Sequence, residues 1–264
     1  MAAGKISGII QSHSRPEGLR RALLSLQMQT YRGFVVVISD DSNDSESIFS
    51  VVDDFVRAGL RIKFKHTGPC GAAESMREAL MRTRCDFIKI LHDDDWLTPR
   101  SLEIQLNALL GNADTNVVYG SALICYPHED KVFYSFAEKA TKIPSQQWIN
   151  MYAKDGFGPV QSPVTALYRR HPKFRVMWDE FENPELREAA RKTGAGTDVS
   201  LQVENAGSNA CVILLPMVVC FLGTDMDSTT QTDKNIAKYY QRSGSVNTIA
   251  IRIGCGEMTV QDFF

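Results

Sequence analysis

The sequence predicts an α/β fold in which a mostly parallel sheet is covered by helices on both faces of a single domain. Short apolar runs alternate with amphipathic segments through the first half, which is the rhythm of strands and helices around a parallel sheet. The 264 residues are enough for one such domain with a substantial core. We expect 1–125 and 126–264 to be two halves of this domain, because no linker separates them.

The elements of the first half follow this rhythm in order. The run GFVVVIS (33–39) is continuously apolar, which is typical of a strand buried on both faces. The segment 16–29 carries leucines at roughly helical spacing behind a proline, which favours a helix with one buried face. We expect strands at 5–12, 33–39, 61–66, 86–91 and 116–126, and helices at 16–29, 48–59, 71–84 and 98–111. In the last helix, Thr98 is the expected N-cap and Pro99 lies in the first turn.

The second half is less regular. We expect a strand at 162–170, a short helix at 199–207, and strand material at 210–222 that is one strand or two strands broken at Pro216. A further helix is expected at 233–244, and 245–264 contains a β-like stretch to which we assign no role.

Composition excludes several classes of protein. Acidic and basic residues nearly cancel, 31 against 29, and no basic stripe favours nucleic-acid binding. Six scattered cysteines without a CxxC pair are typical of reduced thiols in a cytoplasmic protein. We see no signal peptide, and the longest apolar run, 210–223, is too short for a transmembrane segment. We therefore expect a soluble protein.

Three consecutive aspartates, Asp93, Asp94 and Asp95, follow the strand expected at 86–91. Asp40 and Asp41 follow the strand at 33–39, and ligands bind parallel sheets beyond the carboxyl ends of the strands. Five carboxylates at one edge need a counterion, and oxygen ligands favour Mg²⁺ or Mn²⁺, which often bridges a carboxylate to substrate phosphates. The alternative is a polar turn that caps the next helix.

The first part of the chain resembles family 2 glycosyltransferases of the GT-A fold, whose sheet is Rossmann-like. The resemblance depends on three motifs in order within 5–125: Gln29-Thr30-Tyr31, Asp40 to Asp44 (DDSND), and ILHDDDWLTP. It implies that 1–125 binds a nucleotide-diphosphate sugar donor, and that 126–264 binds a glycan or another hydroxyl acceptor.

The resemblance also implies a role for each matching residue. Asp41 would hydrogen-bond the nucleotide base, and Asp93 and Asp95 would bind the Mn²⁺ or Mg²⁺ ion. The donor-binding residues that it implies are Gln11, Ser12, His13, Arg15, Asp41, Arg77, Asp93 and Asp94. Two of them have alternative interpretations without a ligand: His13 as an ordinary loop histidine and Arg77 as a solvated charge on a helix face. The chain departs from the family at Glu74-Ser75, where an Arg-Asn pair is common.

The family places its catalytic base in an acidic motif at the start of a helix in the second half. The match here is Asp198 in GAGTDVSLQVENA, with Thr-Asp in place of Glu-Asp, and the alternative is an N-cap aspartate. Asp179 and Glu180 are the second choice. Asp225 or Asp227 would be a third metal ligand or part of a solvated loop. The aromatic residues Trp148, Tyr152, Phe157 and Trp178 would stack on a sugar or belong to the core.

These features predict a metal-dependent, inverting glycosyltransferase of glycan or polysaccharide assembly. A sugar nucleotidyltransferase also needs acids and a metal, but it requires a glycine-rich phosphate loop, and QSHSRPEGLRR is not such a loop. A non-catalytic nucleotide-sugar-binding module is the third possibility, because the Thr-Asp motif and Glu74-Ser75 depart from the family.

Overall fold

The computed structural model describes residues 4–125, 132–134, 137–148, 162–171, 197–207 and 210–223. These segments form one sheet with the strand order β3-β2-β1-β4-β9-β6-β10-β5, to which β7 and β8 add at β6 and β10. The strands are β1 (Ile6–Ser12), β2 (Phe34–Asp40), β3 (Ile62–His66), β4 (Phe87–His92), β5 (Trp96–Leu97), β6 (Thr115–Cys125), β7 (Val132–Tyr134), β8 (Thr141–Pro144), β9 (Ala166–Arg169) and β10 (Cys211–Gly223).

The sheet is mostly parallel, as the sequence predicts. β1, β2, β3 and β4 run in one direction, and β10 runs parallel to β6. The exception in the middle is β9, which is antiparallel to both β4 and β6. The order β3-β2-β1-β4 places the carboxyl ends of three consecutive βα units side by side, and this edge carries the site described below.

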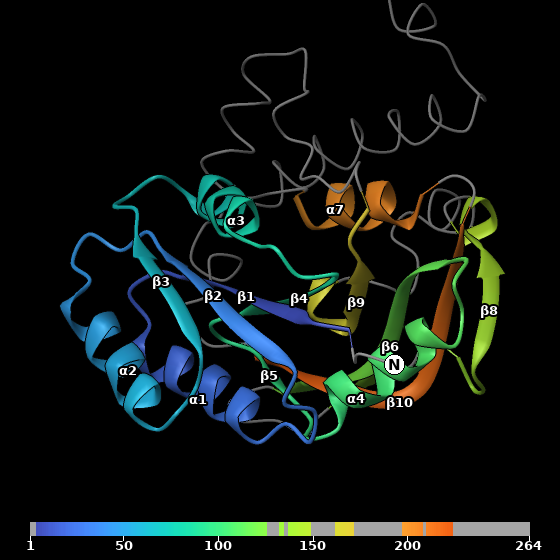
Figure 1. The fold of residues 1–264 in the computed structure, drawn as a ribbon, viewed down its shortest axis with the longest axis horizontal. Coiled ribbons are helices and arrows are strands. Elements are labelled where there is room, and N and C mark those ends of the chain that lie inside the picture. Colours follow the sequence, from blue (N-terminus) through green and yellow to red (C-terminus); the bar gives the residue numbers. More distant parts are fainter. Residues whose placement is uncertain are drawn as a thin grey trace, which may run out of the picture.

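Helices cover both faces of the sheet, with α1, α2 and α4 on one side and α3 and α7 on the other (Figure 1). The helical segments are α1 (Pro16–Gln27), α2 (Glu46–Arg57), α3 (Ala72–Met81), α4 (Ser101–Leu110), α7 (Thr197–Ala206) and the 3-10 turn η1 (Pro163–Thr165). In this arrangement, the buried apolar residues of each helix pack against the sheet, and the single-domain α/β prediction is confirmed for the described part of the chain.

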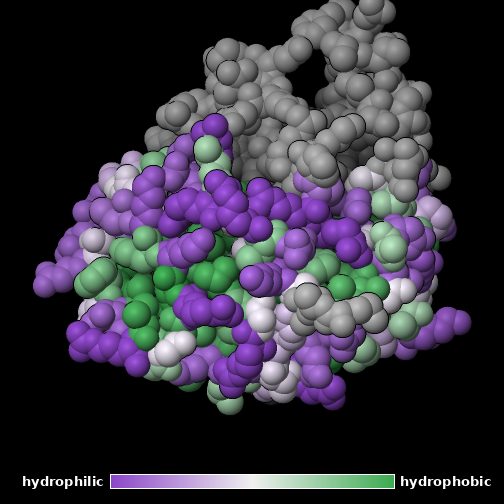
Figure 2. Space-filling model, in the orientation of Figure 1, coloured by the Kyte–Doolittle hydropathy of each residue, from purple (hydrophilic) through white to green (hydrophobic). Residues whose placement is uncertain are grey.

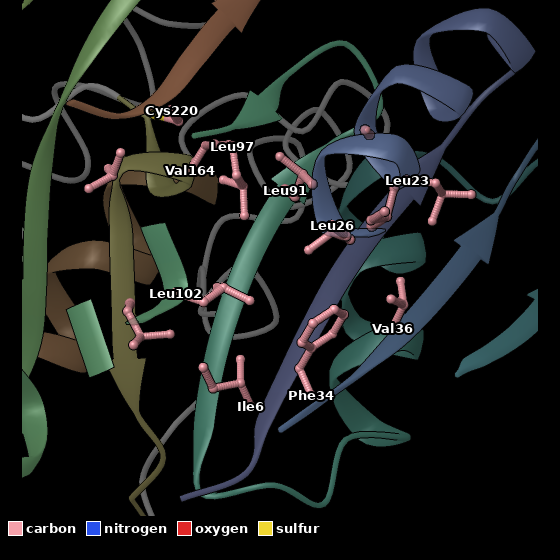
Figure 3. Packing of buried hydrophobic residues seen from close by; sticks show 14 of the residues in the cluster. Ile6, Leu23, Leu26, Phe34, Val36, Leu91, Leu97, Leu102, Val164 and Cys220 are labelled. Carbon is pink, nitrogen blue, oxygen red and sulfur yellow. The ribbon is translucent and has the colours of Figure 1, made fainter. Parts of the chain in front are cut away.

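Two buried apolar clusters correspond to these two layers. Figure 3 shows part of the larger one, where Leu26 of α1, Leu91 of β4 and Leu102 of α4 are all fully buried. The second cluster lies on the face of α3 and α7 and contains Trp148, which stacks on Tyr119 with ring centroids 5.4 Å apart. Trp148 is therefore a core residue and not a platform for a sugar.

Several boundaries differ from the prediction. The helix expected at 98–111 begins at Ser101, because Thr98 bonds the carbonyl groups of β10 through its N–H and its hydroxyl and is not the N-cap. The segment 162–170 is half 3-10 turn and half strand. β10 is one long strand, and its pairing with β6 shifts register around Pro216, which has no N–H to donate.

The remaining predictions for the second half lie outside the described residues, namely the helix at 233–244 and the stretch 245–264. Among the described helices, none combines the length and the hydrophobicity that crossing a membrane requires. On the surface, hydrophobic residues gather where Figure 1 draws β2 and β3 (Figure 2). Near this edge of the sheet, Phe49 of α2 is 56% exposed and contacts the ring of Phe64 of β3 edge-on.

Candidate functional site

The strand register brings three loops to one edge of the sheet. Ser12 at the end of β1 pairs with Asp40 at the end of β2, and Gln11 pairs with His92 at the end of β4. The loops that follow these three strands therefore begin next to one another. Ligands of parallel sheets bind beyond such strand ends, so this edge is the candidate site.

The acidic turn, which we define as Asp93 to Asp95, is held by groups from both neighbouring loops. The guanidinium group of Arg15 contacts Asp93 at 2.7 Å and Asp94 at 2.8 Å. The N–H of His13 donates to Asp93 at 3.0 Å, and the N–H of Gly223 donates to Asp95 at 2.8 Å. The predicted metal ligands Asp93 and Asp95 therefore share one turn with Asp94.

Burial dominates the electrostatics of this turn. It raises the pKa of Asp93 to about 6, although Arg15 and the N–H of His13 lower it. Burial and the charge of Asp94 also raise the pKa of Asp95. Two buried carboxyl groups thus have raised pKa values at the candidate edge, and such groups are common in functional sites.

Asp41 connects the loops after β1 and β3. Its carboxylate lies 3.1 Å from Nδ1 of His13 and accepts the N–H of Gly71 at 3.1 Å, at the N-cap of α3. The side chain of His13 is 56% exposed, so its ring is accessible from solvent. Gln11 donates to the carbonyl of Ala72, which ties β1 to the start of α3. These contacts bring the predicted base-binding residues together.

Ser12 and Asp40 lie at the same corner of the site, at the ends of β1 and β2. The hydroxyl of Ser12 is buried and has no hydrogen-bond partner within the described part of the chain. Asp40 is the exception to the expected convergence of five carboxylates. It is fully buried and bonds the hydroxyl of Ser42 at 2.6 Å and the ring of His66 at 3.0 Å. Asp40 therefore stabilises the end of β2 and does not join the acidic turn.

Asp198 lies near the acidic turn, although about one hundred residues separate them in the chain. It belongs to the first turn of α7, which begins at Thr197, so Asp198 is not the N-cap. Burial raises its pKa, while the charge of His92 lowers it and that of Asp94 raises it again. Burial lowers the pKa of His92, but the charges of Asp198 and the acidic turn outweigh this effect and raise it.

The departure at Glu74-Ser75 has a structural explanation. The hydroxyl of Ser75 is buried and donates to the carbonyl of Ser39 at 3.2 Å, so this side chain faces the sheet. Arg77 forms an ion pair with Glu74 at 3.2 Å along the same helix. A donor-binding role for Arg77 stays a prediction.

Close backbone contacts at the acidic turn were missed in the sequence. A Cβ atom on Gly18 of α1 would collide with the carbonyl oxygen of Asp93, and one on Gly223 would collide with that of Asp94. Glycine is thus required where α1 and β10 approach the turn. A glycine in the first turn of an otherwise regular helix is the signal that could have identified Gly18.

A stack of side chains beside the turn was also missed. The guanidinium group of Arg21 lies 4.5 Å from the ring centroid of Trp96 and donates to the carbonyl of Asp94 at 3.0 Å. Trp96 in turn stacks on Phe221 of β10 at 5.3 Å. This stack depends on the pairing of β5 with β10, which no local pattern predicts.

Some predicted residues lie outside the described part of the chain. They are the second-choice bases Asp179 and Glu180, the third-ligand candidates Asp225 and Asp227, and the aromatic residues Tyr152, Phe157 and Trp178.

Comparisons with known proteins match this architecture. The chain is 30% identical over 127 residues to a GalNAc(5)-diNAcBac-PP-undecaprenol beta-1,3-glucosyltransferase of Campylobacter jejuni, with 46% of this chain and 38% of that protein covered. It is 25% identical over 116 residues to an uncharacterized glycosyltransferase of Methanocaldococcus jannaschii, with 43% and 40% covered. The matched region therefore spans only about two fifths of these curated relatives.

Solved structures show the same fold. The structure of Staphylococcus aureus TarS 1–349 in complex with UDP superposes with a TM-score of 0.63 at 18% identity, covering 92% of this chain and 65% of that one. Its complex with UDP-GlcNAc gives 0.64 at 15% identity, with 92% and 66% covered. The model of the family described as Glycosyl transferase family 2 matches residues 7–172. Since that match spans more than half of the sequence, the chain belongs to glycosyltransferase family 2 and has its GT-A fold.

Proposed function

We propose that this chain is a metal-dependent, inverting glycosyltransferase that moves a sugar from a nucleotide-diphosphate sugar to a hydroxyl acceptor in glycan or polysaccharide assembly. The observation that carries the proposal is that Asp198 lies close enough to His92 and to Asp94 of the acidic turn for their charges to shift its pKa. It brings a candidate base next to the candidate diphosphate site. We further propose a cytoplasmic location, on the basis of the scattered cysteines.

The donor would bind with its base against Asp41 and its diphosphate toward the acidic turn. Asp41 is fixed by Gly71 and His13, so its carboxylate is already oriented for a base. The exposed ring of His13 offers a stacking surface, and the unpartnered hydroxyl of Ser12 offers a hydrogen bond. The TarS complexes contain UDP and UDP-GlcNAc, which makes a uridine donor the first one to test.

The proposed occupant of the acidic turn is a hard divalent cation. Carboxylate oxygens are the ligands that Mg²⁺ and Mn²⁺ prefer, and such a cation is commonly held by one or two carboxylates together with substrate phosphates and water. Asp95 and Asp93 would hold it here. Burial, and to a smaller extent the neighbouring carboxylates, raises the pKa of both groups, so a cation bound there would stabilise their charged forms. When bound, the ion would stabilise the negative charge of the departing diphosphate.

Asp198 would act as the general base. The acceptor oxygen forms its bond to the anomeric carbon while the bond from that carbon to the diphosphate oxygen breaks, and Asp198 takes the proton of the acceptor hydroxyl. Burial raises the pKa of Asp198, and a higher pKa makes its carboxylate a stronger base than an exposed aspartate. The reaction needs the ionised form, so the rate should rise as the pH rises through this pKa.

The test compares Asp198→Asn with Asp114→Asn, a control that removes an exposed aspartate paired with Lys142 at 2.6 Å. Donors linked to UDP, GDP and dTDP are first screened with Mn²⁺ by thermal shift, and turnover is then measured with the best one. We expect Asp198→Asn to lower kcat by roughly 10²–10⁴-fold with unchanged nucleotide affinity, because general-base help has this size. The control should keep wild-type kcat.

Other outcomes would contradict the proposal. Equal turnover in wild type and Asp198→Asn would remove the base assignment. Donor binding without turnover in the wild type would indicate a non-catalytic nucleotide-sugar-binding module. Release of pyrophosphate from a nucleoside triphosphate and a sugar phosphate would indicate a sugar nucleotidyltransferase.

A further inference from the structure

Arg15 spans two carboxylates of the acidic turn. One arm of its guanidinium group lies 2.7 Å from Asp93 and the other lies 2.8 Å from Asp94. Its backbone is anchored, since its carbonyl accepts the N–H of Leu19 and the next residue is Pro16, the first residue of α1. A planar guanidinium fork matches a pair of carboxylates better than a flexible ammonium group does. The chain thus supplies its own cation to the site.

The two arms are held unequally. Asp93 is almost completely buried and also accepts the N–H of His13, so its contact with Arg15 belongs to a larger network. The side chain of Asp94 is 16% exposed, and its carboxylate has only Arg15 as a hydrogen-bond partner among the described residues. The arm on Asp94 is therefore the one that an incoming ligand can replace at lower cost.

We infer that Arg15 is a resident counterion of the acidic turn that competes with a divalent cation held by Asp93 and Asp95, and that its contact with Asp94 gives way first. This inference rests on the proposed cation site. A unit positive charge and a divalent cation repel each other strongly over a few Å in a partly buried site. The two therefore cannot share the carboxylates without a further negative group.

A nucleotide diphosphate supplies that negative group. Its phosphate oxygens can bind the cation and the released guanidinium at the same time, so they remove the competition. Cation and nucleotide should then each strengthen the binding of the other by the same factor, as thermodynamic linkage requires. Arg15 would make cation binding depend on the donor and would keep the ligand-free site from trapping metal.

The experiment measures Mn²⁺ binding to the purified chain by the electron paramagnetic resonance signal of the free ion, without nucleotide and with saturating UDP. The variants are Arg15→Gln and Arg15→Lys, and Arg20→Gln is the control. Arg20 lies on the same helix in an exposed pair with Asp54 at 2.9 Å, away from the turn.

We expect Arg15→Gln to bind Mn²⁺ without nucleotide at least about tenfold more tightly than wild type, since the loss of a unit charge near a cation exceeds about 1.4 kcal/mol. UDP should then enhance Mn²⁺ binding less in Arg15→Gln than in wild type. Arg15→Lys keeps the charge but not the two-armed contact, so its Mn²⁺ affinity should lie between those of Arg15→Gln and wild type, while Arg20→Gln should match wild type.

Equal or weaker Mn²⁺ binding by a folded Arg15→Gln would overturn the inference. If donor turnover persists in the wild type in that case, the proposed function survives. If no variant binds Mn²⁺ with or without UDP, the cation site and this inference fail together. If Arg15→Gln does not fold, the displacement of Arg15 is tested by NMR instead, with a titration of ¹⁵N-arginine-labelled wild type by Mg²⁺ and UDP. Guanidinium signals of Arg15 that stay unchanged at saturation would refute displacement, and shifted signals would support it.

Discussion

Lys89 lies in the middle of β4 and is fully buried, which is rare for a lysine. Its amino group donates to the side-chain carbonyl of Gln105 at 2.7 Å. Burial lowers its pKa from 10.5 to about 8, although Cys220 raises it slightly. Cys220 provides no negative charge near neutral pH, because burial raises the pKa of its thiol to about 12. We predict that replacing Lys89 by methionine changes how stability depends on pH.

The magnitude follows from proton linkage. Between pH 8 and 10.5 the unfolded chain binds a proton at Lys89 that the folded chain has lost, so the free energy of unfolding rises with pH there. Below pH 8 both states are protonated, and the penalty stays at roughly 3 kcal/mol, which is the pKa difference at 1.36 kcal/mol per unit. About 1.3 kcal/mol of this penalty should disappear between pH 7 and pH 9.

The assay is urea unfolding of wild type and Lys89→Met at pH 7, 8 and 9 under reducing conditions. At pH 7 the variant loses the penalty but also a charged hydrogen bond of about 1.5–3 kcal/mol, so the two proteins should have similar stability. By pH 9 the wild type should gain about 1.3 kcal/mol relative to the variant. The exposed Lys63, replaced by methionine, is the control and should give the same difference from wild type at each pH. Parallel pH profiles for Lys89→Met and wild type would refute the reasoning.

Two further substitutions test close contacts. Gly223→Ala should push β10 away from the carbonyl of Asp94, which should destabilise the fold by about 1–3 kcal/mol, as overpacking does, and weaken UDP binding. Thermal unfolding measures the loss of stability and calorimetry measures the UDP affinity, and an unchanged UDP affinity would contradict this prediction. Gln105→Leu should cost about 2–4 kcal/mol in urea unfolding, because two buried backbone carbonyls of β6 and η1 and the amino group of Lys89 lose their partner. A loss below 1 kcal/mol would show that these groups find other partners.

Local patterns were sufficient for most strands and helices of the first half of the fold. The continuous apolar run at 33–39 predicts β2 within one residue, because a strand buried on both faces needs no partner information to be identified. The start of α4 was predicted wrongly at Thr98, because the hydrogen bonds of Thr98 to β10 come from a segment about 120 residues away. β5 was missed for the same reason, because its two residues form a strand only by pairing with the distant β10.

The sequence predicted which residues belong to the candidate site, but it did not predict their hydrogen-bond and ion-pair partners. The strand ends identify Asp41 and Asp93, yet nothing in the spacing says that Asp40 bonds His66. Consecutive residues of a strand point to opposite faces, and this rule was the available signal for separating Asp40 at the end of β2 from Asp41 directly after it. The position of Asp198 beside the acidic turn depends on the packing of α7 against the sheet, and only the family resemblance could suggest it.

Asp93 and Asp95 remain costly even with the contacts that the described part of the chain provides. Arg15, the N–H of His13 and the N–H of Gly223 all favour the charged forms of Asp93 and Asp95, but burial still raises both pKa values. For Asp93 the rise from 3.8 to about 6 corresponds to a cost of the charged form on the order of 3 kcal/mol. A turn that served only stability would use neutral side chains at these buried positions and avoid this cost. Retaining carboxylates there makes sense when a positively charged ligand completes the site, since that ligand recovers the free energy that the fold leaves unbalanced.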